Sequence, residues 1–210
     1  MKRLARKRPL PGLVSDRSGI GIVEFALTVP LVVALSMGGI ELANLALTHM
    51  RVSQIALTVA DNAGRVTTRI DEGDIDEVFA GAQLVGETID FEENGRVVLS
   101  SLQHNGLEDD DEGQMVNWQR CFGDLDVDPS YGVQGDGRTD GSLQGMGPAG
   151  REIATVEGTA VMFVEVSYQY TPIIGSVIAP RTLRYESAFI VRGRTEHNIT
   201  NGSGGPVNSC

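Results

Sequence analysis

The residue types that carry most enzyme chemistry are scattered along this 210-residue chain. Its three histidines, His49, His104 and His197, lie far apart in the sequence. The sequence has no Gly-x-Ser-x-Gly nucleophile motif, no phosphate-binding glycine loop and no Cys-x-x-Cys pair. It therefore predicts a protein that is not an enzyme and needs no cofactor.

Alternating aspartates at Asp124, Asp126 and Asp128 resemble the first half of a calcium-binding loop. Such a loop needs glycine at its sixth position and glutamate at its twelfth. Here Pro129 occupies the sixth position and no glutamate occupies the twelfth. We therefore expect a solvated acidic loop and no metal site.

A basic head precedes a long apolar segment. Six of the 17 Lys and Arg residues fall in the first nineteen positions, which leaves residues 20–210 with a formal net charge of −16. Such an acidic body disfavours nucleic acid as a partner. Residues Ile20–Ile40 contain one charge, Glu24, and a helix of this length spans about 30 Å of bilayer core. The positive-inside rule then keeps residues 1–19 in the cytoplasm and exports the rest.

Three interpretations fit this segment. It is a cleaved secretory signal with a weak site at Ala34–Ser36, or a signal anchor in which Glu24 lies at the headgroup edge. In the third, Arg17–Phe25 resembles the processing site of type IV prepilins and pseudopilins. That resemblance implies cleavage between Gly19 and Ile20. It also implies that Glu24 pairs with the new N-terminal amine of a neighbouring subunit and sets the subunit register, beside Phe25.

The pattern downstream predicts an α+β body. Apolar residues at spacings of three and four extend the first helix to about Arg65, with a kink allowed at Pro30 and Gly38. A separate core helix after Gly38 remains the alternative. A second helix is expected over about 74–84, with its acidic residues on a solvated face. Strand-like runs at 159–170 and 182–191 predict an antiparallel pair.

Short sequence segments support two further predictions. An Asn-Gly at 94–95 between strand-like residues 88–91 and 97–102 predicts a β-hairpin. Residues 104–150, with the acidic run 108–112, are expected to form a long surface loop. Cys121 in this loop and Cys210 at the C-terminus allow one disulfide bond in an exported body, with free thiols or an intermolecular bond as alternatives.

Several stretches together resemble the TadE-like family, the pseudopilin or minor-pilin components of tight-adherence (Tad) pilus systems. The most specific resemblance is Val23–Leu27 with Pro30, and the segments 117–121, 131–135 and 164–172 are similar to the body of longer members. The resemblance implies a bacterial inner-membrane protein with a role in assembling or capping a pilus. Its implied partners are the inner membrane, other pilus subunits, the assembly machinery and a prepilin-type peptidase.

The expected organisation has three parts. Residues 1–19 form a basic leader, residues 20–66 a transmembrane and extended pilin-like helix, and residues 67–210 a small periplasmic body with an antiparallel sheet and long loops. The other hypothesis from the sequence is an uncleaved, single-pass, signal-anchored periplasmic binding protein of the cell envelope.

Overall fold

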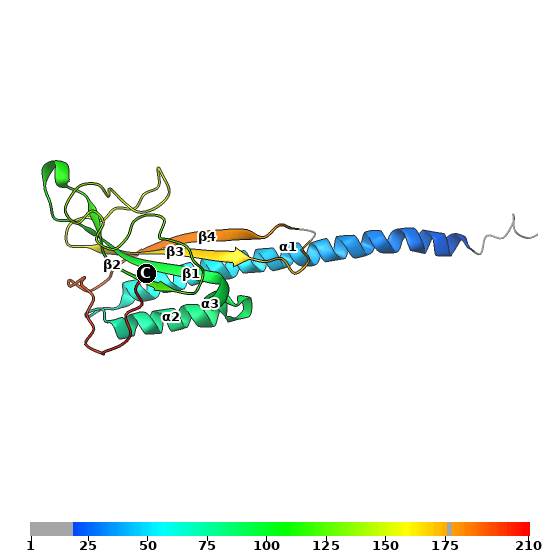
Figure 1. The fold of residues 1–210 in the computed structure, drawn as a ribbon, viewed down its shortest axis with the longest axis horizontal. Coiled ribbons are helices and arrows are strands. Elements are labelled where there is room, and N and C mark those ends of the chain that lie inside the picture. The colour runs from blue at the N-terminus through cyan, green and yellow to red at the C-terminus, as the bar shows by residue number, and fades with distance from the viewer. Residues whose placement is uncertain (1–18, 176–177) are drawn as a thin grey trace, which may run out of the picture.

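The computed structural model describes residues 19–175 and 178–210. A long helix, α1 (Ile20–Arg65), runs out of one end of an α+β body (Figure 1). The body consists of a helix, α2 (Glu72–Gly86), and a four-stranded antiparallel sheet. Of the expected leader, residues 1–19, all but Gly19 lie outside the described residues.

Helix α1 is continuous over 46 residues and confirms the predicted extent of the first helix. Pro30 lies inside it, and the Gly38–Gly39 pair does not divide it. Its first half is exposed, whereas Val52, Ile55 and Val59 of its second half are fully buried. The change from exposed to buried occurs because only the second half packs against the body.

Helix α2 begins two residues before the predicted start and ends two residues beyond the predicted end. Asp71 is its N-cap, and the Asp71 and Asp74 side chains form a reciprocal capping box that satisfies the first free backbone N–H groups. Ile75, Val78 and Phe79 face α1 and the sheet and are buried.

The predicted hairpin around Asn94–Gly95 is wrong. Residues 87–89 form a 3₁₀ turn, η1 (Glu87–Ile89), and the next residues form a short helix, α3 (Phe91–Asn94). Asp90 links them in a left-handed conformation, with φ of 48°. The chain is helical here and forms no hairpin because the helical conformation buries the Phe91 ring, which stacks near Tyr168 and Phe122.

The sheet has the strand order β2-β1-β3-β4, and every neighbouring pair is antiparallel. The strands are β1 (Gly95–His104), β2 (Gln114–Phe122), β3 (Ala160–Tyr170) and β4 (Arg181–Ile190). The predicted pairing of the last two strands is confirmed, with Glu165 opposite Glu186.

Strand β2 lies inside the stretch that was expected to be surface loop, so that expectation is wrong over 114–122. Its side chains Asn117, Gln119 and Arg120 look like loop residues in the sequence, yet all three are buried. Each makes hydrogen bonds within the body, for example from Gln119 Nε2 to Ser100 Oγ at 2.9 Å. Trp118 is also buried, as are Tyr168 and Tyr170.

The two faces of the sheet are covered differently. Both helices pack on one face and form the main core with Val97, Leu99 and Trp118. The other face carries a smaller cluster under the long loop. That cluster consists of Leu102, Val116, Met146, Val161 and Phe163. The body therefore has a helical side, which continues into the exposed helix, and a loop side.

We predict that Gly95→Ala destabilises the body, because a Cβ at this position would lie 2.4 Å from the buried Phe91 ring. Overpacking of this kind costs about 1–3 kcal/mol. The measurement is urea unfolding of the full chain in detergent, followed by fluorescence of Trp118, its single tryptophan.

The control for this variant is Gly81→Ala in α2, where a Cβ would meet only Asn62 Nδ2 at 4.0 Å. Alanine is favoured over glycine inside a helix, so this variant should unfold at an equal or higher urea concentration. Equal stability of the two variants would contradict the role assigned to the Phe91 contact.

Candidate functional site: the exposed helix and its junction with the body

The first half of α1 is an apolar surface that nothing in the described chain covers. Ile22, Phe25 and Leu27 are each about 70% exposed, and the most apolar stretch of the helix has no buried residue. Among the described residues, α1 is the one helix long and apolar enough to cross a membrane. It is consistent with a single-pass membrane anchor.

The four residues predicted to act in processing and assembly lie together at the start of this surface. Gly19 precedes the first turn, and its carbonyl accepts a hydrogen bond from the N–H of Val23 at 3.2 Å. Ile20, Glu24 and Phe25 follow within one and a half turns, all exposed. The Glu24 carboxylate forms no ion pair with any residue of 19–175 or 178–210. It is therefore available to a group outside the described residues.

Glu41 marks the point at which the body begins to cover α1. Its carboxylate is fully buried and accepts hydrogen bonds from the Tyr170 hydroxyl and from the N–H of Ile174, the latter at 2.8 Å. Asn44, one turn further on, donates to the same Tyr170 oxygen at 3.1 Å. Burial, together with the bond to Glu41, raises the pKa of Tyr170. These bonds join α1 to the end of β3.

Glu41 belongs to none of the motifs from which a functional role was expected. The signal for it is a lone carboxylate directly after an uncharged apolar run, where a buried charge needs partners supplied by another element. Those partners come from residues 170 and 174, about 130 positions away along the chain. A second contact, His49 Nδ1 to the Tyr185 hydroxyl at 2.8 Å, joins α1 to β4.

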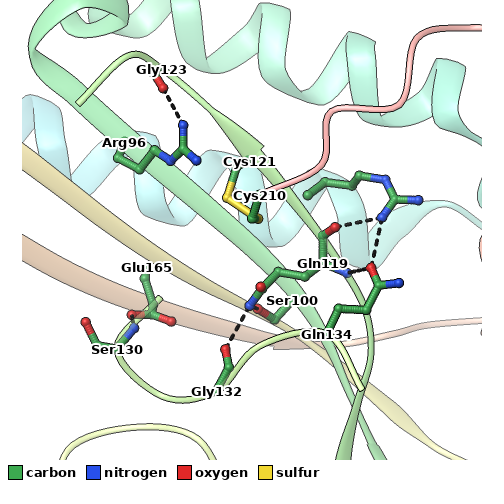
Figure 2. The surroundings of a disulfide bond; sticks show 11 residues. Arg96, Ser100, Gln119, Cys121, Gly123, Ser130, Gly132, Gln134, Glu165 and Cys210 are labelled. Carbon is green, nitrogen blue, oxygen red and sulfur yellow. Dashed lines mark hydrogen bonds between the residues drawn. A yellow bond between two sulfur atoms is a disulfide. The ribbon is translucent and has the colours of Figure 1, made fainter. Parts of the chain in front are cut away.

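Cys121 and Cys210 form the expected intramolecular disulfide bond, with their Cα atoms 5.0 Å apart (Figure 2). Beside it, the N–H of Cys121 donates to the carbonyl of Asn208 at 2.8 Å. The Asn208 side chain donates to Asp76 of α2 at 2.7 Å. The C-terminal tail is thus fixed along the edge of β2 and against α2.

Within the predicted helix 74–84, Glu77 is exposed and Asp74 and Asp76 are half-buried, whereas the observed helix begins earlier, at Glu72, whose role the sequence did not indicate. Glu72 is buried, and its carboxylate forms an ion pair with Arg120 of β2 through both the Nε and Nη2 atoms. Arg120 also donates to the carbonyl of Gln119 at 2.7 Å. A buried carboxylate is retained in this way because a planar guanidinium satisfies both of its oxygens.

Asp71 joins the start of α2 to the tail. Its carboxylate accepts bonds from the Ser203 hydroxyl and from the N–H groups of Gly73 and Gly202. These bonds, led by the one from Ser203, hold the pKa of Asp71 well below its usual range. The carboxylate stays charged and keeps the tail against the start of α2.

The loop side of the sheet carries a group of acidic and phenolic side chains. Glu165 is buried, and one of its oxygens accepts from the N–H of Ser130 at 2.8 Å. Burial raises the pKa of Glu165, and nearby Glu186 adds to the effect. The Tyr131 hydroxyl donates to Glu186 at 2.7 Å, and burial with this bond raises the pKa of Tyr131 to about 12.

The histidines and the acidic runs do not assemble into a shared site in the described residues. His49 contacts Tyr185, His104 lies 3.4 Å from Glu112, and His197 lies 3.3 Å from the carbonyl of Gly158. The acidic run 108–112 borders a polar groove with His104. No metal-holding group of His, Cys, Asp or Glu occurs among residues 19–175 and 178–210.

Comparison with protein families identifies the N-terminal part of the chain. Residues 19–61 match the family described as TadE-like protein. The chain carries a TadE-like domain. No curated protein and no solved structure matches the chain. The TadE-like domain begins at Gly19, contains the exposed apolar surface and Glu24, and extends through the Glu41 junction into the packed half of α1.

We predict that breaking the disulfide bond with Cys121→Ser and Cys210→Ser destabilises the body. The bond closes a loop with a sequence separation of 89, for which the chain-entropy model gives about 4 kcal/mol. The check is the urea midpoint of Trp118 fluorescence, with Ser209→Ala as a control in the same tail. An unchanged midpoint in the double variant would show that the disulfide bond adds nothing to stability.

We predict that Glu165→Gln removes part of the pH dependence of stability. The raised pKa means that folded Glu165 binds a proton more tightly than unfolded Glu165. Its contribution therefore favours folding at low pH and is lost as pH rises above the ordinary glutamate value. Between pH 4 and pH 7 the variant should lose less stability than the unmodified chain, measured by urea unfolding.

The matched control for Glu165→Gln is Glu157→Gln, which neutralises an exposed carboxylate. This control should follow the unmodified chain across the same pH range. If Glu165→Gln also follows it, the burial of Glu165 has no effect on the pH dependence of folding.

Proposed function

We propose that this chain is a TadE-like minor pilin or pseudopilin, with a structural and assembly role in a Tad-type pilus and no catalytic activity. The observation that carries the proposal is the apolar first half of α1. It lies in a TadE-like domain, is exposed on every side and continues without a break into the helix that holds the body. A surface of this kind is stable only in a bilayer or against other apolar helices.

Glu24 supports an assembly role over simple anchoring. A carboxylate at the centre of an apolar span costs about 2.5 kcal/mol or more by insertion scales, and less near an edge, so a partner for Glu24 would stabilise it there. Cleavage between Gly19 and Ile20 would create an amine one helical turn from Glu24. In a bundle of subunits, that amine on one chain and Glu24 on its neighbour would set the axial register.

The body is suited to the far side of the membrane from the leader. Its disulfide bond belongs to an oxidising compartment, and the basic residues before Gly19 favour retention of the leader in the cytoplasm. The resulting topology is single-pass in the bacterial inner membrane with a periplasmic body. The partners are then the inner membrane, a prepilin-type peptidase, other pilus subunits and the assembly machinery.

The test begins with intact mass and N-terminal sequencing of the membrane-bound protein. The proposal predicts a chain that starts at Ile20. Gly19→Ala should retain the leader and abolish pili, measured by electron microscopy and by the sheared surface fraction. Glu24→Gln should be cleaved and inserted normally yet fail to support pili, because the register charge is lost while the shape is kept.

The control is Thr28→Ala, one turn beyond Glu24 on the same exposed helix. The Thr28 hydroxyl bonds only within its own helix, to the carbonyls of Glu24 and Phe25. This variant should therefore support normal pilus formation. A mature chain that retains Met1, with normal pili from Glu24→Gln, would instead support an uncleaved signal-anchored protein. A chain that starts near Met37 would contradict both membrane interpretations.

A further inference from the structure

The two edges of the sheet differ in what covers them. Along β2, the N–H of Gln114 donates to Leu143 and the N–H of Val116 donates to Asp136, at 2.7 and 3.0 Å. The N–H of Gln119 donates to the Gln134 side chain at 3.1 Å. At the end of the strand the disulfide-fastened tail covers Cys121. The edge of β2 is therefore closed to another strand.

The edge of β4 is open. Val191, directly after β4, donates its N–H to Ala160 at 2.9 Å, so odd-numbered residues of this strand bond to β3. The N–H and C=O groups of the even-numbered residues then point away from the sheet. Within residues 19–175 and 178–210, none of these groups has a hydrogen-bond partner. They belong to Thr182, Arg184, Glu186 and Ala188. Beyond them the edge meets α1, because a Cβ on Gly64 would lie 3.6 Å from the Ile190 carbonyl oxygen and the N–H of Arg192 donates to the Gly64 carbonyl at 3.0 Å.

The surroundings of this edge favour an acidic, extended partner. Arg181, Arg184 and Arg192 are exposed along or just after β4, although residues 20–210 carry a net charge of −16. None of the three takes part in an ion pair within the described residues. At the distal end, an open groove between α1 and β4 is lined by the apolar Leu57 and Phe189 and by polar and charged side chains that include Asp61, Arg65 and Arg192. Ile190 beside it is 63% exposed.

The direction of β4 rules against a second copy of this chain as the occupant. Tyr170 of β3, which pairs with Arg181 at the start of β4, contacts Glu41, while Phe189 near the other end of β4 packs at Gly64, so β4 and α1 run the same way. Two copies joined by antiparallel β4 strands would point their exposed helices in opposite directions, which one membrane does not allow. A parallel pairing would bring the like charges of Arg184 together, and β2 of another copy is covered.

We propose that the β4 edge is a docking site for an extended segment of a different protein chain, which adds a fifth strand to the sheet. Backbone hydrogen bonds to the even-numbered residues supply affinity, as in other cases of strand addition. Carboxylates of the added strand oppose Arg181 and Arg184, and an apolar side chain packs near Ile190. The inference does not depend on cleavage of the leader, only on the common orientation of membrane-anchored copies.

The test places a photo-crosslinking amino acid, p-benzoylphenylalanine, at Ile190 of the full chain in membranes of the cells that produce it. The expected product joins this chain to a different protein. Co-expression of two differently tagged copies distinguishes a product between copies of this chain. The same amino acid at Leu84, which is 74% exposed on α2, is the matched position and should give no such product.

Three substitutions at Arg184 separate charge from backbone pairing. Arg184→Ala removes the charge and keeps the outward N–H. Arg184→Pro removes both, and leaves the bonds to β3 intact because this N–H points outward. The proline variant should crosslink about tenfold less than the alanine variant, which corresponds to loss of one backbone hydrogen bond worth about 1.4 kcal/mol.

Arg184→Glu should also lose the product, whereas Arg151→Glu, which makes the same charge change in an exposed loop, should not. Retention of the Cys121–Cys210 bond and of the Trp118 unfolding midpoint confirms that each variant is folded. The proposal is overturned by the absence of a product, by a product between two copies of this chain, or by equal yields from Arg184→Ala and Arg184→Pro. The N-terminal sequence of the same samples tests the pilin proposal independently.

Discussion

The hydrogen bonds between Glu41, Tyr170 and the N–H of Ile174 fix the body to the helix on which everything else depends. Before Glu41, α1 is exposed and apolar apart from Glu24; after it, one face of the same helix is core. A buried carboxylate in this position is stable only when its partners are in place. It therefore fixes the position of the body along α1 relative to the exposed segment.

This fixed position is important if the exposed helix packs against the helices of other subunits. If neighbouring helices set their register through Glu24, a continuous α1 transmits that register to the body. The distance from Glu24 to Glu41 is seventeen residues, or about 25 Å of helix. A hinge at Gly38–Gly39 would uncouple the two parts, but the helix runs through this pair. The TadE-like domain contains both Glu24 and Glu41, which is consistent with one continuous helix that connects them.

Buried polar links join the elements of the body in addition to its apolar core. The Glu72–Arg120 ion pair joins α2 to β2, the Asp71 carboxylate holds the tail, and the disulfide bond closes the same corner. All of these links lie on the β2 side. The β4 side has an open edge next to α1. The side of the body that these links fix is therefore separate from the side that we propose binds a partner.

The sequence by itself determined the elements whose signal is local or compositional. Helix α1, helix α2, strands β3 and β4 and the disulfide pairing follow from periodicity, β-branched content and the presence of two cysteines. Strand β2 and the helical turns at 87–94 did not follow from it. The polar side chains of β2 are buried only because residues far along the chain bond to them, and the Phe91 ring needs a pocket formed by other elements. The roles of Glu41 and Glu72 were decided in the same way, since a buried charge is defined by partners that only tertiary structure brings within reach.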